Sequence, residues 1–390
     1  MEIIGQTIEG QSLRGSDLRG AILTHSVFIN TDLSEVDFRG AHLGGVRFIS
    51  CLLRNAIFHY ACLEGARFID CDLSDCDFNW TREPSVEQET STNPVEPYDD
   101  AQEHITVVEG YLYSVVEWLG SRDDLPPLVA LHGMTGHAFD FADLARRSQR
   151  HTYAINLIGH GQSTPWPVYA CEELPESRPR QAPDFLQATQ HIYSIIQRSI
   201  GDQPFDLLGY SMGGRLALHL SILAKLRRGI SLRRLIVLSA SMGLWGDDER
   251  ARRREVDRAW SDPLWEGADL RQFLQAWNHQ PLLARLRDRA PLKARELLRW
   301  RSLHSPQGLA IAFDCLGLGS MPPLHEQLHL LPQETIWIYG EEDKKFEQIA
   351  RDVAGRSPQI KILGIPHAGH AAHLEDLEAF WASVGDRFEA

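Results

Sequence analysis

The chain has 390 residues, more than one compact domain usually holds, so two folded units are the first expectation. Its 43% hydrophobic and 24% charged residues are typical of a globular protein, and its formal net charge of −14 argues against general affinity for nucleic acid or an anionic membrane. No apolar run is long enough to span a bilayer, and residues 1–10 lack the features of a signal peptide, so the sequence predicts a cytoplasmic protein.

Residues 1–80 divide into sixteen blocks of five, and the third residue of every block is Ile, Leu or Phe. The first residue is mostly small, as at Ser16, Ala21 and Cys51, and the other positions are largely polar. Neither the helical nor the strand period produces this spacing, which places one large and one small side chain inward in every five residues. The segment resembles the pentapeptide-repeat proteins, whose fold is an all-β, right-handed quadrilateral β-helix with four blocks in each coil.

This resemblance implies about four coils over residues 1–80. A docking or stabilising appendage is favoured over a DNA-like surface, and a protein partner or self-association would act through the coil. The cysteines fit the same interpretation, because none forms a CxxC pair and reduced thiols are favoured over disulfides or zinc. Four are predicted to fill the coil and two stand alone: Cys51, Cys62, Cys71 and Cys76, then Cys171 and Cys315.

Residues 81–104 are rich in Pro, Glu, Ser and Thr and have almost no apolar residues, which predicts a linker. From Ile105 onward short apolar runs alternate with helical patterns, and residues 105–120 are typical of a hairpin. Buried strands are predicted in the runs at 127–133, 151–161, 205–211, 232–240, 335–343 and 359–370. Strands that alternate with helices indicate an α/β unit over residues 105–390, with a mostly parallel sheet and helices on both faces. A helical cap is predicted at about 242–334, where strand signals are absent.

The stretch "GYSMGG" places Ser211 between glycines where a predicted strand meets a predicted helix. Such a turn exposes the hydroxyl at the sheet's carboxyl edge. Asp343 and His370 each follow a later strand, and the chain order Ser, Asp, His is that of the α/β-hydrolase fold. His370 would accept the serine proton while Asp343 sets its tautomer. Glu341 or Glu342 could replace Asp343, and His367 or His373 could replace His370.

Two further features surround this predicted triad. In "LHGMTGH" the backbone N–H of Met134, together with that of Met212, would stabilise a developing oxyanion, unless His132 and Gly133 only form a turn. Arg215 lies one helical turn after Ser211 and would point back toward the pocket. The alternative is a surface arginine, and the Arg-rich cap segments also fit amphipathic surface helices.

From about Ile105 the chain resembles the 2-succinyl-6-hydroxy-2,4-cyclohexadiene-1-carboxylate synthases of menaquinone and phylloquinone synthesis (MenH type). The resemblance is carried by "LHGMTG", "GHGQS", "GYSMGGRLAL", "ERARRREVD", "WNHQPLL", "RWRS", "LGLGSMPPLHEQL", "GEEDKKF" and "HAGHAAHLE". It implies a triad of Ser211, Asp343 and His370. The remaining implied residues bind substrate: the carboxylate-binding Arg215, Arg253 and Arg301, the pocket residues Tyr210 and Trp277, and Lys345 as a weaker candidate.

The resemblance also implies a lyase that expels pyruvate from a polycarboxylate substrate and needs no metal or organic cofactor. Ser211, assisted by His370, would remove a ring proton, and the arginines would hold the carboxylates. A serine hydrolase of an acidic ester or a vinylogous C–C bond is the alternative. A pentapeptide-repeat interaction protein with a vestigial hydrolase domain is the third hypothesis. The chain departs from the family at Asn156 and Ile158 and in a long loop over residues 162–184.

Overall fold

The computed structural model describes residues 3–59, 61–63, 66–69, 71–77, 100–163, 182–302 and 304–389. These residues belong to two compact units, a repeat unit up to residue 77 and a larger unit from residue 100, and we describe each by itself. Cys171, residues 81–99 and residues 164–181 of the long loop lie outside the described residues, so the predictions made for them stay predictions.

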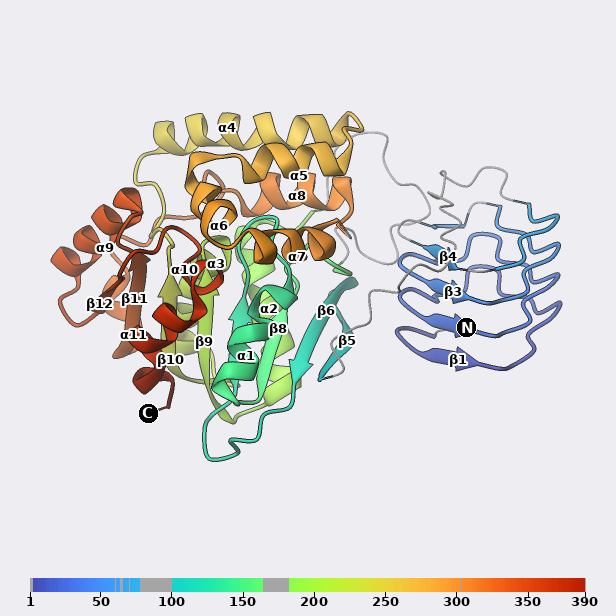
Figure 1. The fold of residues 1–390 in the computed structure, drawn as a ribbon, viewed down its shortest axis with the longest axis horizontal. Helices are drawn as coiled ribbons and strands as arrows, with labels where there is room; N and C mark the ends of the chain where they lie inside the picture. Colours follow the sequence, from blue (N-terminus) through green and yellow to red (C-terminus); the bar gives the residue numbers. More distant parts are fainter. Residues whose placement is uncertain are drawn as a thin grey trace. The chain divides into compact units, whose positions relative to one another are not determined.

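The repeat unit is a stack of parallel coils in which residues pair with residues twenty positions later, as from Thr7 to Val27 and on to Arg47. Bridges with the same spacing, such as Ser12 to Asp32, follow the other sides of the coil. A spacing of twenty residues equals four blocks of five, as the resemblance to pentapeptide-repeat proteins implies (Figure 1). The strands of one side are β1 (Thr7–Glu9), β2 (Val27–Ile29), β3 (Arg47–Ile49) and β4 (Arg67–Ile69).

Large side chains from the third block position fill this coil. The rings of Phe28, Phe48 and Phe68 stack with centroids 5.2 and 4.9 Å apart. Cys51 is buried in the same core and Cys71 packs against it, both as free thiols, which agrees with their predicted place as core fillers. Stacked rings and small residues therefore let each coil bury its neighbour's apolar surface.

The fifth residue of each block turns the corner of the coil. Its φ is positive in every described block, for glycines such as Gly15 at 65° and also for residues such as Glu35 at 61°. No atom lies within 4 Å of the position a Cβ would take on Gly15, so backbone conformation and not space favours glycine there. The sequence analysis used the first and third positions of the block and missed this rule for the fifth.

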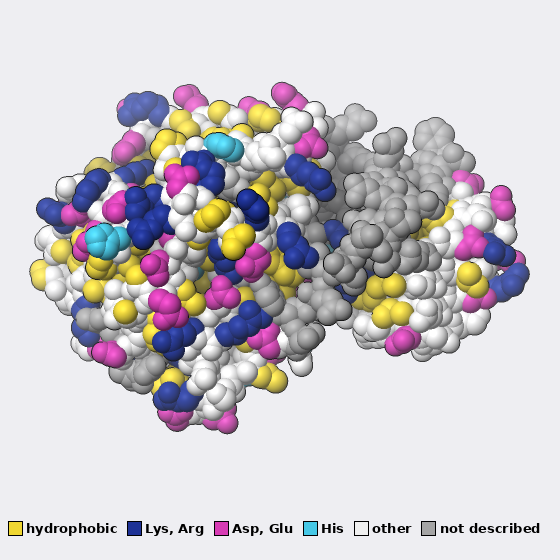
Figure 2. Space-filling model, in the orientation of Figure 1, with side chains coloured by type: hydrophobic (Ala, Val, Ile, Leu, Met, Phe, Trp, Pro, Cys, Tyr) yellow, Lys and Arg dark blue, Asp and Glu magenta, His cyan; other side chains and the backbone are white. Residues whose placement is uncertain are grey.

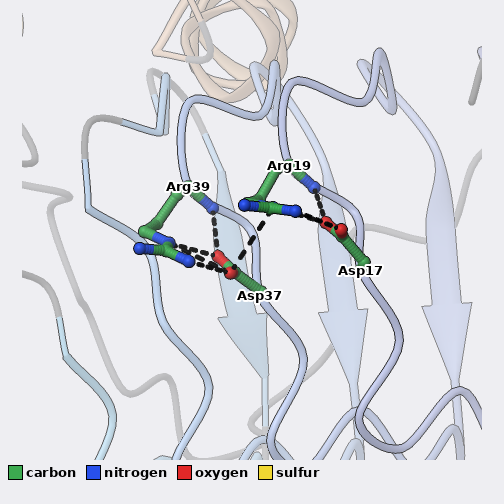
Figure 3. Close-up of polar contacts among 4 residues, drawn as sticks. All are labelled: Asp17, Arg19, Asp37 and Arg39. Carbon is green, nitrogen blue, oxygen red and sulfur yellow. Dashed lines mark hydrogen bonds and ion pairs between the residues drawn. The ribbon is translucent and has the colours of Figure 1, made fainter.

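Ion pairs cover one outer corner of the coils (Figure 3). Arg19 pairs with Asp17 at 2.6 Å within one coil, and Arg39 pairs with Asp37 at 2.6 Å in the next. Arg19 also lies 3.8 Å from Asp37 and so links the two coils. Because the arginines are about half exposed, each pair contributes little to stability.

The larger unit is built on an eight-stranded sheet in the order β12-β11-β10-β9-β7-β8-β6-β5. The pairs from β12 to β8 are parallel, whereas β5 and β6 form the predicted hairpin and join β8 antiparallel. The strands are β5 (Ala101–Val108), β6 (Tyr111–Trp118), β7 (Leu128–Leu131), β8 (Thr152–Ile155), β9 (Pro204–Tyr210), β10 (Ser231–Leu238), β11 (Glu334–Gly340) and β12 (Lys361–Ile365). This is the predicted α/β-hydrolase architecture.

Helices cover the sheet and join its strands (Figure 1). They are α1 (Ala142–Ser148), α2 (Phe185–Ile200), α3 (Met212–Leu226), α9 (Lys344–Arg356), α10 (Ala372–Glu375) and α11 (Leu377–Glu389). Buried side chains of α2, α3 and the central strands form the main core. The central β9 delivers Ser211 to the sheet's carboxyl edge, where the adjoining loops converge.

The segment between β10 and β11 forms a cap of helices, as predicted from residues 242–334 (Figure 1). Its helices are α4 (Asp247–Trp265), α5 (Leu270–Asn278), α6 (Ala284–Arg289), α7 (Pro291–Arg301) and α8 (Pro306–Leu316), with short 3-10 turns η2 (Pro281–Leu283) and η3 (Leu328–Leu330). An aromatic cluster around Phe273, Trp277 and Phe313 forms the inner face of the cap.

The predicted linker is too long by four residues. β5 begins at Ala101, and its first residues, Gln102 to His104, pair with β6. These residues are exposed on the last strand of the sheet, so backbone pairing holds them without apolar side chains, and composition could not reveal the strand. The other domain boundaries stay predictions.

The surface agrees with the charge analysis. On the face drawn in Figure 2, Lys and Arg side chains of the larger unit lie intermixed with Asp and Glu. None of the helices in the described ranges combines the length and apolar composition that a membrane span needs.

Candidate active site

Ser211 stands at the sharp turn between β9 and α3, with a φ of 52° that an L-residue adopts only under strain. Close backbone packing explains the flanking glycines. A Cβ on Gly213 would lie 2.1 Å from the carbonyl oxygen of Leu131, and one on Gly209 would lie 2.5 Å from that of Gly213. The turn therefore needs glycines because neighbouring backbones leave no room, and it places the serine at the end of the strand.

The structure brings Ser211, His370 and Asp343 together in one hydrogen-bonded chain. The Ser211 hydroxyl lies 3.0 Å from Nε2 of His370, and Nδ1 of the same ring lies 2.9 Å from Oδ2 of Asp343. The other oxygen of Asp343 accepts the N–H of Phe346 and caps α9. With the carboxylate bonded to Nδ1–H, Nε2 is free to accept the serine proton.

The alternative triad residues take other places. Glu342 pairs with Arg285 on the surface, and His367 is exposed. His373 is buried and packs against Tyr210 at 4.7 Å, and burial lowers its pKa to about 3. Geometry therefore favours Asp343 and His370 over the glutamates and the other two histidines.

The loop that carries His370 is fixed from two sides. The buried carboxylate of Glu375 accepts the N–H groups of Gly369 at 2.7 Å and Ala371 at 3.0 Å. From the cap, Arg289 donates to the carbonyl of His367 at 2.7 Å. His367 has a φ of 57°, so the cap supports a strained turn three residues before His370.

The predicted oxyanion loop, residues 132–137, lies against the serine turn. The carbonyl of His132 accepts the N–H of Gly213 at 2.9 Å. A Cβ on Gly133 would lie 2.8 Å from the ring of Tyr210 and 3.4 Å from Cβ of Ser211. These contacts place Gly133 and the following Met134 beside Ser211, where Met134 and Met212 were predicted to donate.

Behind this loop lie four buried histidines that the sequence analysis did not single out as a group: His132, His137, His160 and His304. Burial is the largest cause that lowers the pKa of each, to about 3 for His137 and about 4 for His160. Their ring nitrogens bond backbone groups; for example, His132 accepts the N–H of Leu157 at 3.0 Å. They are neutral structural groups near pH 7. The recurrence of His-Gly and Gly-His in the two loops was the available signal.

Asn156, one of the departures from the family, connects the segment at Ala138 to Ser114 of strand β6. Its Oδ1 accepts the N–H of Ala138 at 2.8 Å, and its Nδ2 donates to Ser114 at 2.7 Å. An amide supplies both the acceptor and the donor in this fully buried place, whereas a carboxylate could only accept. The departure therefore keeps the adjoining loop in place.

Arg215 is buried on the first turns of α3, and its Nη1 has no hydrogen-bond partner among the described residues. Burial lowers the pKa of Arg215 to about 10, although Asp257 acts in the opposite direction. Asp257 bonds Nε of Arg253 at 2.9 Å and the N–H of Gly319 at 3.2 Å. Arg215 and Arg253 thus share one neighbouring carboxylate, and a buried guanidinium retains an unused donor.

Lys345 lies near the same cations. Burial is the main cause that lowers its pKa, and the positive charges of Arg253 and Arg215 lower it further, while Asp343 raises it. Its ammonium lies 5.5 Å from the centroid of the Phe346 ring.

Arg301, the third arginine implied by the resemblance, already has protein partners. It donates to the buried Asp140 at 3.2 Å and to Asn278 at 3.4 Å, while its Nε has no partner among the described residues. Burial raises the pKa of Asp140, and Arg301 opposes that shift. Sequence reasoning missed Asp140, since one acidic residue in a loop carries no pattern.

Tyr210 lies beside the triad, and Trp277 lies in the aromatic cluster of the cap. The Tyr210 ring lies 5.5 Å from that of His370. The Trp277 ring lies 5.0 Å from those of Trp260 and Phe313, and its indole N–H is buried without a partner among the described residues. Met134 packs against the same cap cluster, which links Trp277 to the oxyanion loop. No group of His, Cys, Asp and Glu within the described ranges is placed to hold a metal ion.

Two family models match the chain. The alpha/beta hydrolase family matches residues 128–383, and pentapeptide repeats match residues 8–40 and 31–68 in 8 copies. The first match covers strands β7 to β12, the cap, and Ser211, Asp343 and His370.

Individual relatives show to which enzymes of the alpha/beta hydrolase family the chain is similar. The chain is 29% identical over 266 residues to the 2-succinyl-6-hydroxy-2,4-cyclohexadiene-1-carboxylate synthase of Photorhabdus laumondii, covering 67% of this chain and 85% of the relative. It is 30% identical over 253 residues to the enzyme of that name from Salmonella agona, covering 64% and 89%. The solved structure of MenH from S. aureus matches with a TM-score of 0.59 and 26% identity, covering 73% of this chain and 100% of that one.

Proposed function

Because this chain belongs to the α/β-hydrolase family, and within it to the 2-succinyl-6-hydroxy-2,4-cyclohexadiene-1-carboxylate synthases (MenH type), we propose that it performs their reaction in menaquinone or phylloquinone biosynthesis. That reaction eliminates pyruvate from a succinyl-enolpyruvyl-hydroxycyclohexene-carboxylate. The product is 2-succinyl-6-hydroxy-2,4-cyclohexadiene-1-carboxylate.

The observation that carries the proposal is Arg215 beside the triad. A buried guanidinium with an unused donor is costly to leave unpaired, so a ligand that supplies an anion would be favoured there. Arg253 increases the positive charge, and the buried Nε of Arg301 has no hydrogen-bond partner among the described residues. A substrate with several carboxylates fits this distribution, whereas a neutral ester would leave Arg215 without a partner.

The triad would supply the base. Ser211 passes its proton to His370 across 3.0 Å as its oxygen removes the activated ring proton, and Asp343 stabilises the resulting imidazolium. The electron pair of the broken C–H bond forms the new ring double bond, and the enolpyruvyl C–O bond breaks. The ring proton restores the Ser211 hydroxyl, and His370 gives its proton to the released enolpyruvate, which becomes pyruvate and leaves the imidazole neutral again.

Binding groups would orient this elimination. The N–H groups of Met134 and Met212 would hold the oxygen on which charge builds, because fixed donors need no reorganisation as the reaction proceeds. Arg215, Arg253 and Arg301 would hold the carboxylates, and Tyr210 and Trp277 would line the apolar part of the site. No step requires a cofactor. The cytoplasmic location and a partner for the repeat unit stay predictions.

The test gives purified protein the succinyl-enolpyruvyl substrate and measures pyruvate release with a coupled lactate dehydrogenase assay, alongside a panel of chromogenic esters. We expect pyruvate release that is lost in Ser211→Ala. Ester turnover without pyruvate would favour the hydrolase hypothesis instead. No turnover in either assay would favour the vestigial-domain hypothesis. The unbroken hydrogen-bonded triad argues against that hypothesis.

A further inference from the structure

Thr135, the residue after the predicted oxyanion donor Met134, adopts a backbone conformation that its side chain disfavours. Its φ is 59°, in the left-handed region that is strained for a β-branched residue. The residue is completely buried, so no solvent contact compensates this strain. Surrounding contacts must therefore hold the peptide between Met134 and Thr135 in place.

Two buried histidines hold Thr135 by its two backbone groups. The N–H of Thr135 donates to Nε2 of His160 at 3.1 Å, and its carbonyl accepts from Nε2 of His304 at 3.2 Å. His160 belongs to the turn after β8 and donates its own Nδ1–H to the carbonyl of Ile158 at 3.1 Å. His304 belongs instead to the cap, between α7 and α8.

The hydrogen bonds of His304 define which nitrogen carries its proton. Its Nδ1 accepts the N–H of Gly161 at 2.9 Å, so the proton is on Nε2 and points to Thr135. The ring is buried and lies 5.2 Å from that of His160 and 6.0 Å from that of His137. One cap side chain thus connects the oxyanion loop to the turn at residues 159–161.

A second contact connects the cap to the same loop. The side chain of Met134 packs against the apolar cluster of cap residues around Phe273 and Phe313. The cap therefore touches the donor residue by its side chain and, through His304, the peptide between Thr135 and Gly136 by a hydrogen bond. It is placed to determine the direction of the Met134 N–H.

We propose that His304 is a positioning residue of the active site: from the cap, it holds the Thr135 carbonyl so that the Met134 N–H points at the oxyanion. This deepens the proposed function and rests on it for the identity of the reacting oxygen. The cap then does more than cover bound substrate, because its seating on the sheet completes the oxyanion hole. His304 itself touches no reacting atom.

Two variants separate the two bonds of His304. In His304→Gln the side-chain amide reaches the place of Nε2 and retains a donor for Thr135, but it loses the acceptor for Gly161. In His304→Asn the carbonyl takes the place of Nδ1 and retains the acceptor, but it loses the donor. Ser302→Ala is the matched control, because Ser302 is an exposed residue of the same segment whose hydroxyl bonds only the helix carbonyl of Arg299.

We expect kcat for pyruvate release to fall about tenfold to a hundredfold in His304→Asn, less than the loss of an oxyanion donor itself. His304→Gln should recover most of this rate, KM should change little in either variant, and Ser302→Ala should match the wild type. Equal kcat in His304→Asn and the wild type, in a variant that is folded by circular dichroism, would overturn the proposal. So would equal losses in both His304 variants, because cap stability alone would then explain the effect.

A second readout does not depend on the native substrate. A fluorophosphonate forms a covalent bond to Ser211 with loss of fluoride, and its phosphoryl oxygen occupies the oxyanion hole, so the rate of adduct formation measured by mass spectrometry reports the hole directly. The same ranking of variants is expected. If that ranking holds while no pyruvate is released, the positioning role stands and the proposed function fails. If wild-type Ser211 does not react, the hole is not formed and the positioning role fails.

Discussion

The two units of this chain use the same strained backbone conformation in opposite ways. In the repeat unit a positive φ recurs at the fifth residue of each described block, at open corners such as Gly15, where a side chain would meet no neighbour. In the larger unit it occurs at single, irregularly spaced positions, among them Thr135, Ser211 and His367. Those three are held by hydrogen bonds and close backbone packing from distant segments. The positive φ that recurs at the coil corners is part of the framework of the repeat unit. At Thr135, Ser211 and His367, in contrast, contacts from distant segments hold the positive φ at the proposed active site.

The largest test of this comparison is at Ser211. Ser211→Ala should lower kcat by about 10⁴-fold or more, because it removes the group that moves the proton. Ser211→Gly should lose the same activity. Its free energy of unfolding should be roughly 1–2 kcal/mol higher than that of Ser211→Ala, because glycine adopts φ of 52° without strain. Pyruvate assays and thermal unfolding measure the two effects. Equal stability of the two variants would show that the turn is not strained.

Lowering the pH should destabilise the two units over different pH ranges. Burial lowers the pKa of His137, His160 and His373 to between about 3 and 4, below the value of about 6.5 in the unfolded chain. As pH falls below 6.5 the unfolded state binds protons that the folded state does not, so stability is lost. At pH 5 each such histidine lowers the free energy of unfolding by about 2 kcal/mol.

The repeat unit should respond mainly at lower pH. Hydrogen bonds from Arg39 to Asp37 and from Ser34 to Asp32 lower the pKa of these carboxyls, so their contribution is present above about 4 and is lost as pH falls further. Burial also lowers the pKa of His42, which adds a smaller effect near pH 6. Calorimetry at a series of pH values measures the transitions of both units. A single transition with one pH profile would contradict this separation.

Charge gives the next contrast, between Arg215 and the exposed arginines of Figure 3. Arg215→Ala should lower kcat/KM for the polycarboxylate substrate by an amount equivalent to about 2–4 kcal/mol of transition-state free energy, since a buried donor to a bound anion is lost. Arg19→Ala, which breaks the half-exposed pairs with Asp17 and Asp37, should leave kcat/KM unchanged and alter stability very little, because solvent screens these pairs. Steady-state kinetics measure both variants. An unchanged kcat/KM in Arg215→Ala would make that arginine structural.

An effect confined to the stability of the repeat unit is expected at a corner of the coil. Gly15→Ala should destabilise the repeat unit by roughly 1–2 kcal/mol, because alanine must adopt φ of 65° even though space is available. Pyruvate release should not change, since the residue lies in the other unit. Calorimetry tests the first statement and kinetics the second. A stability equal to that of the wild type would show that the corner relaxes.

Sequence reasoning succeeded where a pattern repeats or where chain order carries chemistry. The five-residue period identified the resemblance to pentapeptide-repeat proteins, which implied the twenty-residue coil spacing, and the order of Ser211, Asp343 and His370 after strands predicted the three residues that the structure brings together. It missed Asp140 and the grouping of His137, His160 and His304, because single residues in separate loops form no pattern until the chain folds. It also placed residues 101–104 in a linker, because an exposed edge strand lacks apolar residues.

By itself the sequence determined the period of the coil, the alternation of strands and helices, the nucleophile turn and the arginine one helical turn beyond it, since each depends on local spacing along the chain. Only the tertiary structure decided which partners Arg301 and Arg215 have, how Asn156 joins its two segments, and that a cap histidine reaches Thr135. These depend on which distant backbones approach within hydrogen-bond distance and on how completely water is excluded there. Burial then converts ordinary histidines and arginines into groups with shifted pKa values and defined partners.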